Sequence, residues 1–299
     1  MLWRVRCGGC CREIQVTEVF VDFHLHSDHT DGVEVDLDAM LDRAAEAGLD
    51  GVCITDIGAT RHAPDLIRAG AAAGVEVFVG LELLTDHGAL LGFAPAIDSF
   101  YLREEWRELT TLGTPRASRF VEVFERVGGA TIAAYPYDPS ATWATGDRIF
   151  NIKGLSGIEA WVPRVPTSRN ALGVEAAAAM GVGVCGGTDF RGGNLSKIGE
   201  AATLLARPAH SQAEFVEIVR AGDFWAVSLG VAVEDPKPRT QEERDRAAED
   251  GRGRGRRDGR PGGDRGRRSE RGGDRDRGGD RGRGGGRRRE GGGRGRSRD

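Results

Sequence analysis

The sequence lacks several features that mark whole classes of protein. No stretch approaches the roughly 20 consecutive apolar residues that a membrane-spanning helix needs. The N-terminus carries charge but no apolar run like that of a signal peptide. The five cysteines are odd in number, and two of them, Cys53 and Cys185, lie in apolar, strand-like runs. These absences exclude a membrane protein and a disulfide framework, and they predict a cytoplasmic protein.

Residues 251–299 have no aromatic, aliphatic or cysteine side chain to bury. Of these 49 residues, 19 are Arg, 19 are Gly and eight are Asp or Glu, which gives the segment a net charge of +11. Residues 1–250 therefore carry −15. A segment without apolar side chains cannot offset the entropy of ordering, so we predict a disordered tail.

Three roles are open for this tail. Arg-Gly segments bind RNA through phosphate attraction and guanidinium stacking, with a strong dependence on salt. The missing aromatic residues and the eight acidic residues predict RNA binding that is weak and tolerant of sequence. The tail is otherwise a solubilising extension, or a cationic chain attracted to the acidic residues 1–250.

The cluster Cys7, Cys10 and Cys11 has the C-x-x-C spacing of zinc and dithiol redox sites. A zinc site needs two more ligands nearby, and the next dozen residues provide none. No strand–helix unit frames the pair, as a redox motif would require. We therefore interpret these cysteines as part of an extension ahead of the first strand.

The body of the chain reads as alternating strands and helices. The near-continuous apolar strands predict a parallel sheet covered by helices, and seven or so strands in about 215 residues favour a closed barrel. The expected strands are 19–26, 51–55, 75–83, 89–93, 130–135, 157–162, 181–185 and 224–229. The expected helices are 36–47, 64–74, 103–110, 116–127, 171–180 and 211–221. The predicted organisation is an N-terminal extension (1–17), a barrel domain (18–232), a charged linker (233–250) and the tail (251–299).

The segment from Asp22 to Gly32, D-F-H-L-H-S-D-H-T-D-G, is the most informative stretch of the chain. Side chains two residues apart on a strand share a face, so His24 and His26 point the same way. Two imidazoles at a strand end, followed by a carboxylate on the turn, are typical of a metal-binding edge. Burying both histidines without a metal would be costly, so metal ligation is favoured.

This pattern resembles the opening motif of the PHP (polymerase and histidinol phosphatase) family, and similar segments follow in the family's order over about residues 19–205. The resemblance implies a distorted (β/α)7 TIM-like barrel and a metal-dependent phosphoesterase. Ile54-Thr-Asp56 resembles I-T-D-H, and Gly80-Leu-Glu82 with Ala89-Leu-Leu-Gly92 resembles G-x-E…H-x-x-G. Ala133-Ala-Tyr135-Pro136 resembles A-H-P, Gly157-Ile-Glu159 precedes an Ala-rich helix, and Gly187-Thr-Asp189-Phe-Arg191 resembles G-S-D-x-H.

Typical members of the family hold up to three metal ions with about nine ligands, and the resemblance assigns only part of that set to this chain. The first ion keeps all four ligands: His24, His26, Glu82 and Asp189. The second ion shares Glu82 but loses both imidazoles, and the third keeps Asp31 but loses its partners. The four missing histidine positions hold Ile57, Ala89, Tyr135 and Arg191. The resemblance therefore implies a site reduced to about one divalent ion, and two imidazoles with two carboxylates suit Zn²⁺, Mn²⁺ or Fe²⁺.

Two residues near this set have open roles. Arg191 either holds a substrate phosphoryl oxygen in place of a lost ion, or pairs with Asp31 and neutralises an inactive site. Asp56 either orients a strand histidine or caps the turn that follows it.

The remaining histidines have weaker claims on the site. His87 lies two residues before Ala89 on the same strand face, a displacement of roughly 6–7 Å from the lost ligand position. His29 is expected in a solvated loop. His62 and His210 lie at helix starts and are expected on the surface.

Two functions remain open on the sequence. The first is hydrolysis of a phosphate mono- or diester, such as a nucleotide or an RNA end, by the metal held by His24, His26, Glu82 and Asp189. Asp31 would accept a proton or position the attacking water. The alternative is an inactive PHP-like scaffold, or an RNA-binding protein acting through its tail. One intact ligand set favours the enzyme, because random drift would remove ligands from all three ions.

Overall fold

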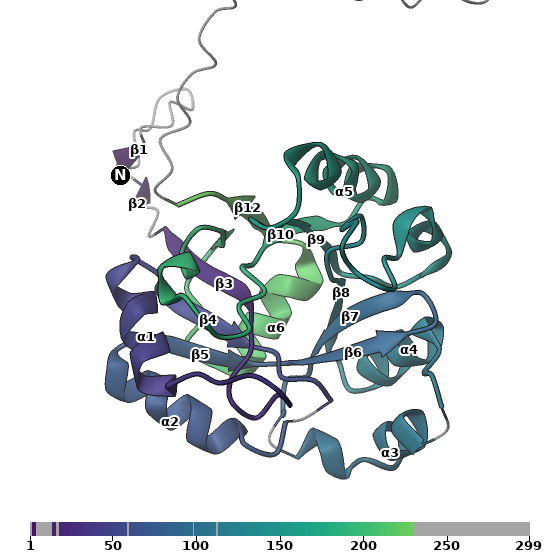
Figure 1. Cartoon of the computed structure of the whole chain (residues 1–299), viewed down its shortest axis with the longest axis horizontal. Helices are drawn as coiled ribbons and strands as arrows, with labels where there is room; N and C mark the ends of the chain where they lie inside the picture. Colours follow the sequence, from purple (N-terminus) through teal and green to yellow (C-terminus); the bar gives the residue numbers. More distant parts are fainter. Residues whose placement is uncertain are drawn as a thin grey trace, which may run out of the picture. The chain divides into compact units, whose positions relative to one another are not determined.

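A ten-stranded sheet curves until its two edges almost meet (Figure 1). The computed structural model describes residues 2–3, 14–15, 18–58, 60–97, 99–111 and 113–229. The chain divides into two units, 1–233 and 234–299, and the described residues all belong to the first. The strand order in the sheet is β5-β4-β3-β11-β12-β10-β9-β8-β7-β6.

The strands of the sheet are short and mostly buried. Their bounds are β3 (Val19–Leu25), β4 (Gly51–Ile54), β5 (Glu76–Val79), β6 (Leu81–Thr85), β7 (Gly88–Phe93), β8 (Ala130–Ala133), β9 (Gly157–Trp161), β10 (Gly183–Gly186), β11 (Ala202–Leu205) and β12 (Phe224–Val227). A separate antiparallel pair joins β1 (Leu2–Trp3) to β2 (Ile14–Gln15).

The sheet closes at a single bend in the chain. Strands β5 and β6 are separated only by Gly80; β5 pairs with β4, whereas β6 pairs with β7. The segment after β4 also reaches β6, because Glu82 N donates to Asp56 O (3.1 Å) and Gly58 N donates to Glu82 O (2.9 Å). A side chain at Gly80 would place its Cβ 2.5 Å from the Phe93 ring, so the bend requires glycine.

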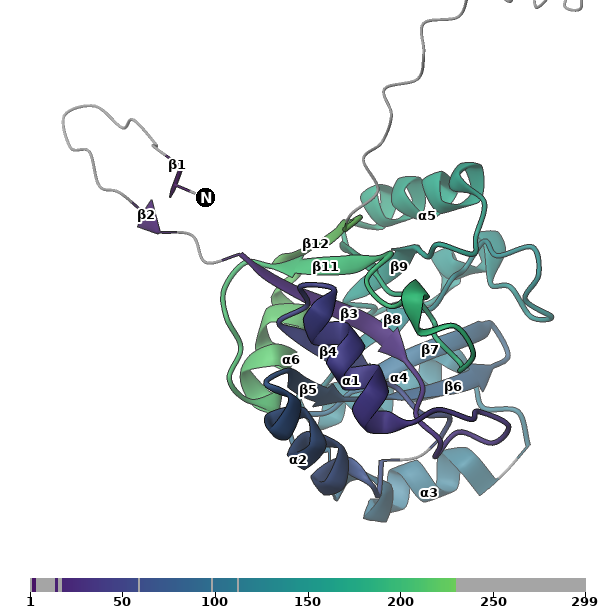
Figure 2. The same cartoon turned by 60° about the vertical axis from the view of Figure 1, so that its left-hand side comes forward.

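Helices cover the outside of the ring, and one of them fills an end of it. The helices are α1 (Leu37–Glu46), α2 (Ala63–Ala73), α3 (Glu104–Thr111), α4 (Ala117–Arg126), α5 (Thr167–Met180) and α6 (Gln212–Ala221), with 3-10 turns η1 (Phe100–Leu102), η2 (Gly146–Asn151) and η3 (Leu195–Lys197). Figure 2 shows α1 and α2 beside β4 and β5, and α5 beside β9. Helix α6 instead touches strands from both halves of the ring, β5 and β8.

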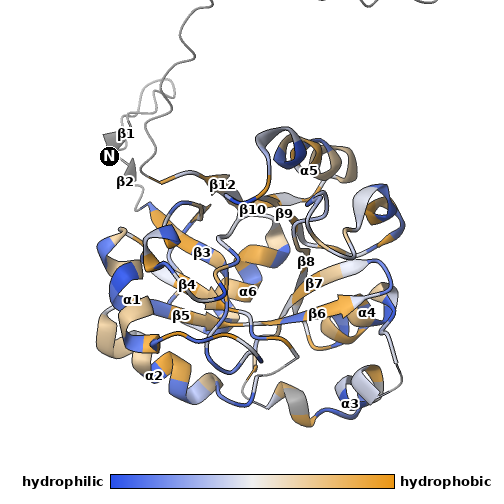
Figure 3. Ribbon diagram, in the orientation of Figure 1, coloured by the Kyte–Doolittle hydropathy of each residue, from blue (hydrophilic) through white to orange (hydrophobic). Residues whose placement is uncertain are grey.

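The interior of the ring is aromatic at the end that α6 occupies. The Phe215 ring stacks on Phe78, with a centroid separation of 4.3 Å, and meets Phe23 and Phe93 edge-on at 5.3 Å. In Figure 3 the strands are coloured mainly as hydrophobic, whereas the helices alternate between hydrophobic and hydrophilic residues. This is the pattern of a barrel core shielded by amphipathic helices.

The predicted α/β barrel is confirmed, with local differences. All six expected helices are present; α5 begins four residues earlier than predicted, because Thr167 to Asn170 carry no apolar periodicity. The sheet is mixed: β6–β7, β7–β8, β11–β12 and β11–β3 are antiparallel pairs, so the prediction of a parallel sheet was wrong for these strands. Strand β11 was not predicted, and the expected strand 75–83 is split at Gly80.

Some predictions fall outside the described residues. These are the linker 233–250, the disordered tail 251–299 and the cysteines Cys7, Cys10 and Cys11. Among the described residues, no helix is long and apolar enough to span a membrane.

Candidate metal centre

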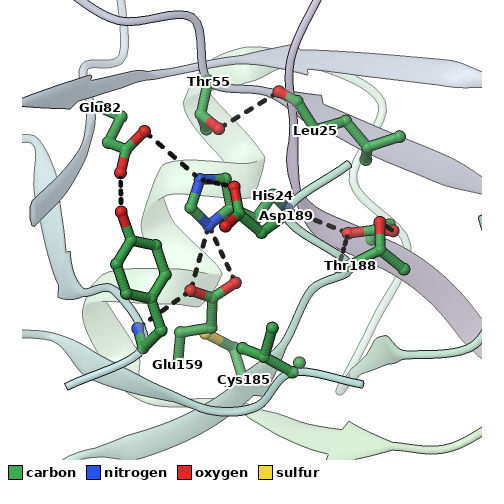
Figure 4. A network of polar contacts seen from close by, with 12 residues as sticks. His24, Leu25, Thr55, Glu82, Glu159, Cys185, Thr188 and Asp189 are labelled. Carbon is green, nitrogen blue, oxygen red and sulfur yellow. Dashed lines mark hydrogen bonds and ion pairs between the residues drawn. The ribbon is translucent and has the colours of Figure 1, made fainter. Parts of the chain in front are cut away.

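The four residues predicted to bind one ion meet where several strands end at one rim of the ring. His24 lies near the end of β3 and His26 directly after it, Glu82 is on β6, and Asp189 follows β10. Both histidines are fully buried, and Glu82 and Asp189 are almost so. Figure 4 shows His24 between the carboxylates of Glu82, Asp189 and Glu159. Strands distant in sequence therefore bring the predicted set together.

The Nε2 atoms of the two histidines lie close to each other and to one oxygen each of Glu82 and Asp189. His24 Nε2 lies 3.1 Å from His26 Nε2, 3.4 Å from Asp189 Oδ1 and 3.8 Å from Glu82 Oε2. His26 Nε2 lies 3.3 Å from Glu82 Oε2 and 3.5 Å from Asp189 Oδ1. Ligand atoms about 2.0–2.2 Å from a tetrahedral metal are roughly 3.3–3.6 Å apart. The distances from the two Nε2 atoms to these oxygens lie near this range, and His24, His26 and Asp189 form a group able to hold a metal.

Hydrogen bonds on the far side of each imidazole fix which nitrogen faces the centre. His24 Nδ1 lies 3.0 Å from both oxygens of Glu159, so it donates its proton to that buried carboxylate. His26 Nδ1 lies 3.0 Å from Thr30 Oγ1, whose own proton goes to Asp56 Oδ1 at 2.7 Å. With both Nδ1 atoms acting as donors, the two Nε2 atoms face each other and share one cation, either a proton in an Nε2–H···Nε2 hydrogen bond or a metal ion.

Two arginines approach the same carboxylates from the pocket side. Arg191 donates through Nη2 to Glu82 Oε2 (2.5 Å) and through Nε to Asp189 Oδ1 (2.8 Å). Arg164 forms ion pairs with Asp189 and with the buried carboxylate of Asp138. Arg191 thus pairs with two of the predicted metal ligands and not with Asp31, the partner in one of the two roles that the sequence left open.

Tyr135 completes the wall beside His24. Its hydroxyl donates to Glu82 Oε1, and its ring stacks on His24 with a centroid separation of 5.8 Å and an interplanar angle of 14°. The Cζ atom of Arg164 lies over the Tyr135 ring, 4.7 Å from its centroid. Tyr135 and Asp189 have left-handed backbones, with φ of 31° and 46°. Such conformations are uncommon for residues other than glycine and gather at functional sites.

The charges of the cluster set its protonation. Burial opposes a charged His24, but Glu159 and Asp189 outweigh it and raise the pKa of the imidazole well above its ordinary value. Burial also opposes a charged Glu82, yet hydrogen bonds from His24 and His26 and the charge of Arg191 hold its pKa well below the usual range. The centre therefore attracts a cation, whether a proton or a metal ion.

A pocket of about 450 Å³ opens over the carboxylates, a volume typical of small-molecule sites. The histidines lie beneath its floor. Its lining includes Glu82, Tyr135, Asp138, Arg164, Asp189 and Arg191 together with Ile57, Leu84, Ala89 and Trp143. The pocket therefore opens onto the two carboxylates of the cluster, Glu82 and Asp189.

Asp31 is exposed in the turn after β3 and is absent from the pocket lining among the described residues, so its catalytic role stays a prediction. Asp56 takes one of the two roles that the sequence left open, because it acts on His26 through Thr30. It also accepts hydrogen bonds from Ser27 N and Oγ, which tie down the turn after β3 and not the turn that follows Asp56. The structure thus explains why this carboxylate is buried.

The other histidines lie away from the centre, as the sequence suggested. His87 Nδ1 pairs with the neighbouring Asp86 at 3.0 Å, and the His29 ring stacks on His62 with centroids 3.6 Å apart. His210 is exposed ahead of α6.

Three residues of the site carried no role in the sequence analysis. Glu159 lay in a segment resembling the family, but only the fold shows that it faces His24 Nδ1. Thr30 lay in the first motif without an assigned function. Arg164 matched none of the motif positions, so nothing in the sequence pointed to it.

The comparisons with known proteins agree with this geometry. Residues 22–169 match the PHP domain, a range that includes His24, His26 and Glu82 and ends before Asp189. An uncharacterized protein from Methanocaldococcus jannaschii is 31% identical over 119 residues, 39% of this chain, and the chain spans only 60% of that relative's length.

Two solved structures share the fold. PsfC from Pseudomonas syringae covers 80% of this chain and 98% of its own, with 16% identity and a TM-score of 0.52. The lesion-specific endonuclease Q from Pyrococcus furiosus covers 70% of this chain and 58% of its own, with 15% identity and a TM-score of 0.51. The chain belongs to the PHP domain family.

Replacing Thr30 with Val, a change of similar shape, removes the acceptor for His26 Nδ1 and a donor to Asp56. Because both partners are buried, we expect the free energy of unfolding to fall by about 1–3 kcal/mol in chemical denaturation. Thr110→Val on the exposed face of α3 is the matched control and should cost less than about 0.5 kcal/mol. Equal stability of the two variants would mean that Thr30 does not hold His26 in place.

Proposed function

We propose that the protein is a metal-dependent phosphoesterase whose centre holds one divalent ion through His24, His26, Glu82 and Asp189. The observation that carries this proposal is the pair of Nε2 atoms 3.1 Å apart, each with its Nδ1 engaged as a donor. One cation, a proton or a metal ion, is shared between two imidazoles so arranged, and a divalent ion there would also lie within reach of the Glu82 and Asp189 carboxylates. Membership of the PHP family, and the donor set of two nitrogens and two oxygens, support Zn²⁺, Mn²⁺ or Fe²⁺ as that cation.

The single-ion state is supported by what surrounds the set. Arg191 already contacts the two carboxylate oxygens, Glu82 Oε2 and Asp189 Oδ1, that face the histidines. Its guanidinium supplies positive charge where further ions would bind, and Tyr135 fills the place of a lost imidazole beside Glu82. A second ion would have to displace both side chains.

Several residues of the site would have separate roles in the hydrolysis of a phosphate ester. A divalent ion supplies Lewis acidity toward a phosphoryl oxygen and acidifies water at neutral pH. Glu159 and Thr30 orient the two imidazoles. Arg191 and Arg164 line the pocket and present guanidinium N–H groups suited to phosphoryl oxygens. Asp31, on the turn after β3, would accept a proton from water if that turn closes over the substrate.

The alternative of an inactive scaffold is favoured by one observation. Arg191 and Arg164 form ion pairs with Glu82 and Asp189, so the chain itself supplies counter-charge to both carboxylates. Metal content and turnover decide between the two functions.

The first test is metal stoichiometry in the full chain. We expect elemental analysis to give about one Zn, Mn or Fe per chain, and we expect His24→Ala or Asp189→Ala to lose it. His210→Ala, at an exposed histidine, is the matched control and should retain the metal. Two or three ions per chain would overturn the reduced site. No metal, with the variants as stable as the parent, would favour the scaffold.

The second test separates the roles of Arg191. Arg191→Ala should lower the turnover of a phosphate ester roughly 100-fold, because a fixed donor to the phosphoryl group is lost. The metal should stay bound, since removing a nearby positive charge favours a cation. Glu82→Gln should abolish turnover. Arg207→Ala, at a surface arginine paired with Glu217, is the control. An unchanged rate in Arg191→Ala would show that Arg191 holds no phosphoryl group.

We also propose that the tail 251–299 binds single-stranded RNA weakly. Its net charge of +11, against −15 for residues 1–250, supports this. Deleting the tail should remove most RNA affinity, and binding by the full chain should weaken steeply from low to physiological salt. A tail with every Arg changed to Lys keeps the charge and tests guanidinium stacking. Equal affinity with and without the tail at low salt would refute the proposal.

A further inference from the structure

One part of the pocket is apolar although its floor is charged. Ile57, Leu84 and Trp143 are large hydrophobic side chains that stay 49%, 46% and 57% exposed, and all three line this pocket. Ala89 adds a further apolar surface. Exposed apolar side chains gathered in one hollow mark a ligand surface, whereas scattered ones need no explanation.

The charged and the apolar side chains line one and the same pocket. The pocket therefore offers a charged floor for a phosphoryl group and an apolar surface for the group that is esterified to it.

Trp143 is exposed on a backbone that is held firmly. Gly146 N donates to Pro136 O (2.7 Å), which closes the loop that carries Trp143. Arg148 donates to Thr145 O (3.2 Å) and Ala144 O (2.9 Å), and reaches Asp86 O in the neighbouring hairpin at 3.4 Å.

The hairpin between β6 and β7 packs closely against this loop. Gly88, with φ of 100°, lies so near that an added Cβ would be 2.9 Å from Trp143 O and 2.3 Å from Thr145 Oγ1. An aromatic side chain on a fixed backbone binds a flat ring with little loss of conformational entropy.

We propose that the pocket takes phosphate esters that carry a planar aromatic group, which stacks on Trp143 while the phosphoryl group meets Arg191 and Arg164. This substrate class rests on the proposed phosphoesterase function. The aromatic group belongs to a nucleoside or to an aryl alcohol, because both present the same flat face. Stacking on an aromatic side chain is worth about 1–3 kcal/mol per ring, roughly a 5- to 150-fold effect on affinity.

The test compares three substrates on the metal-loaded full chain: phenyl phosphate, adenosine 5′-monophosphate and glycerol 3-phosphate. Trp143→Ala should raise KM at least fivefold for whichever aromatic substrate the parent hydrolyses, and it should leave kcat for that substrate within twofold. It should leave both constants for glycerol 3-phosphate within twofold. Trp143→Phe should recover most of the affinity. Leu102→Ala is the control, because Leu102 is 64% exposed and lies outside the pocket lining.

The outcomes separate this inference from the proposed function. A KM effect on adenosine 5′-monophosphate alone assigns a nucleoside, and an effect on phenyl phosphate alone or on both assigns a simple aryl group. Equal effects on all three substrates, or on none, would overturn the role of Trp143 while the phosphoesterase stands. If the parent hydrolyses none of them, the proposed function fails. Calorimetry of phenylphosphonate against methylphosphonate then tests the site: a phenyl preference that Trp143→Ala abolishes supports it, and no preference refutes it.

Discussion

Two imidazole nitrogens held face to face govern the arrangement of this protein's site. His24 and His26 are buried with their Nε2 atoms 3.1 Å apart, and each Nδ1 is committed to an acceptor behind it. Neutral nitrogens in this position need a positive charge between them, and the buried carboxylates around them need the same. The side chains around the two histidines supply hydrogen-bond acceptors for the Nδ1 atoms and negative charge beside the Nε2 atoms.

Two arginines supply counter-charge to the carboxylates of the cluster. Carboxylates gathered in a buried site repel one another unless positive charge lies between them. Here Arg191 bridges Glu82 and Asp189, while Arg164 joins Asp189 to Asp138. Guanidinium groups carry one fixed charge each and also offer planar pairs of donors. The arginines therefore favour the ionised carboxylates, and their guanidinium groups face the pocket.

Sequence reasoning succeeded where spacing dictates geometry. The alternation of side chains along a strand predicted that His24 and His26 share one face. The order of the motifs predicted that Glu82 and Asp189 lie beside them. It failed where a contact depends on the fold alone. Arg164 follows β9 in a stretch without any motif, and it reaches Asp189 only because β9 and β10 are neighbours in the sheet.

The fold was predictable to a similar extent. Helices with an apolar face and strands with continuous apolar runs were found from their patterns. Strand β11, four residues of Ala, Thr and Leu, is too short to show a period, and its antiparallel pairing with β3 and β12 follows from topology. The split of the expected strand 75–83 depended on the Phe93 ring, which leaves no room for a side chain at Gly80. Such a constraint is set by tertiary packing and is invisible in local sequence.

The bend at Gly80 ties the chemistry to the closure of the barrel. Glu82 lies two residues beyond it, at the seam where the segment after β4 meets β6 through only a few backbone hydrogen bonds. Of the histidines that Glu82 faces, His24 lies on β3 and His26 directly after it, and β3 pairs with β4 on the other side of the seam. An ion bound by these side chains would link the two sides of the seam, and opening the seam would move Glu82 away from the histidines. Local opening of the barrel and release of the ion would then be the same motion.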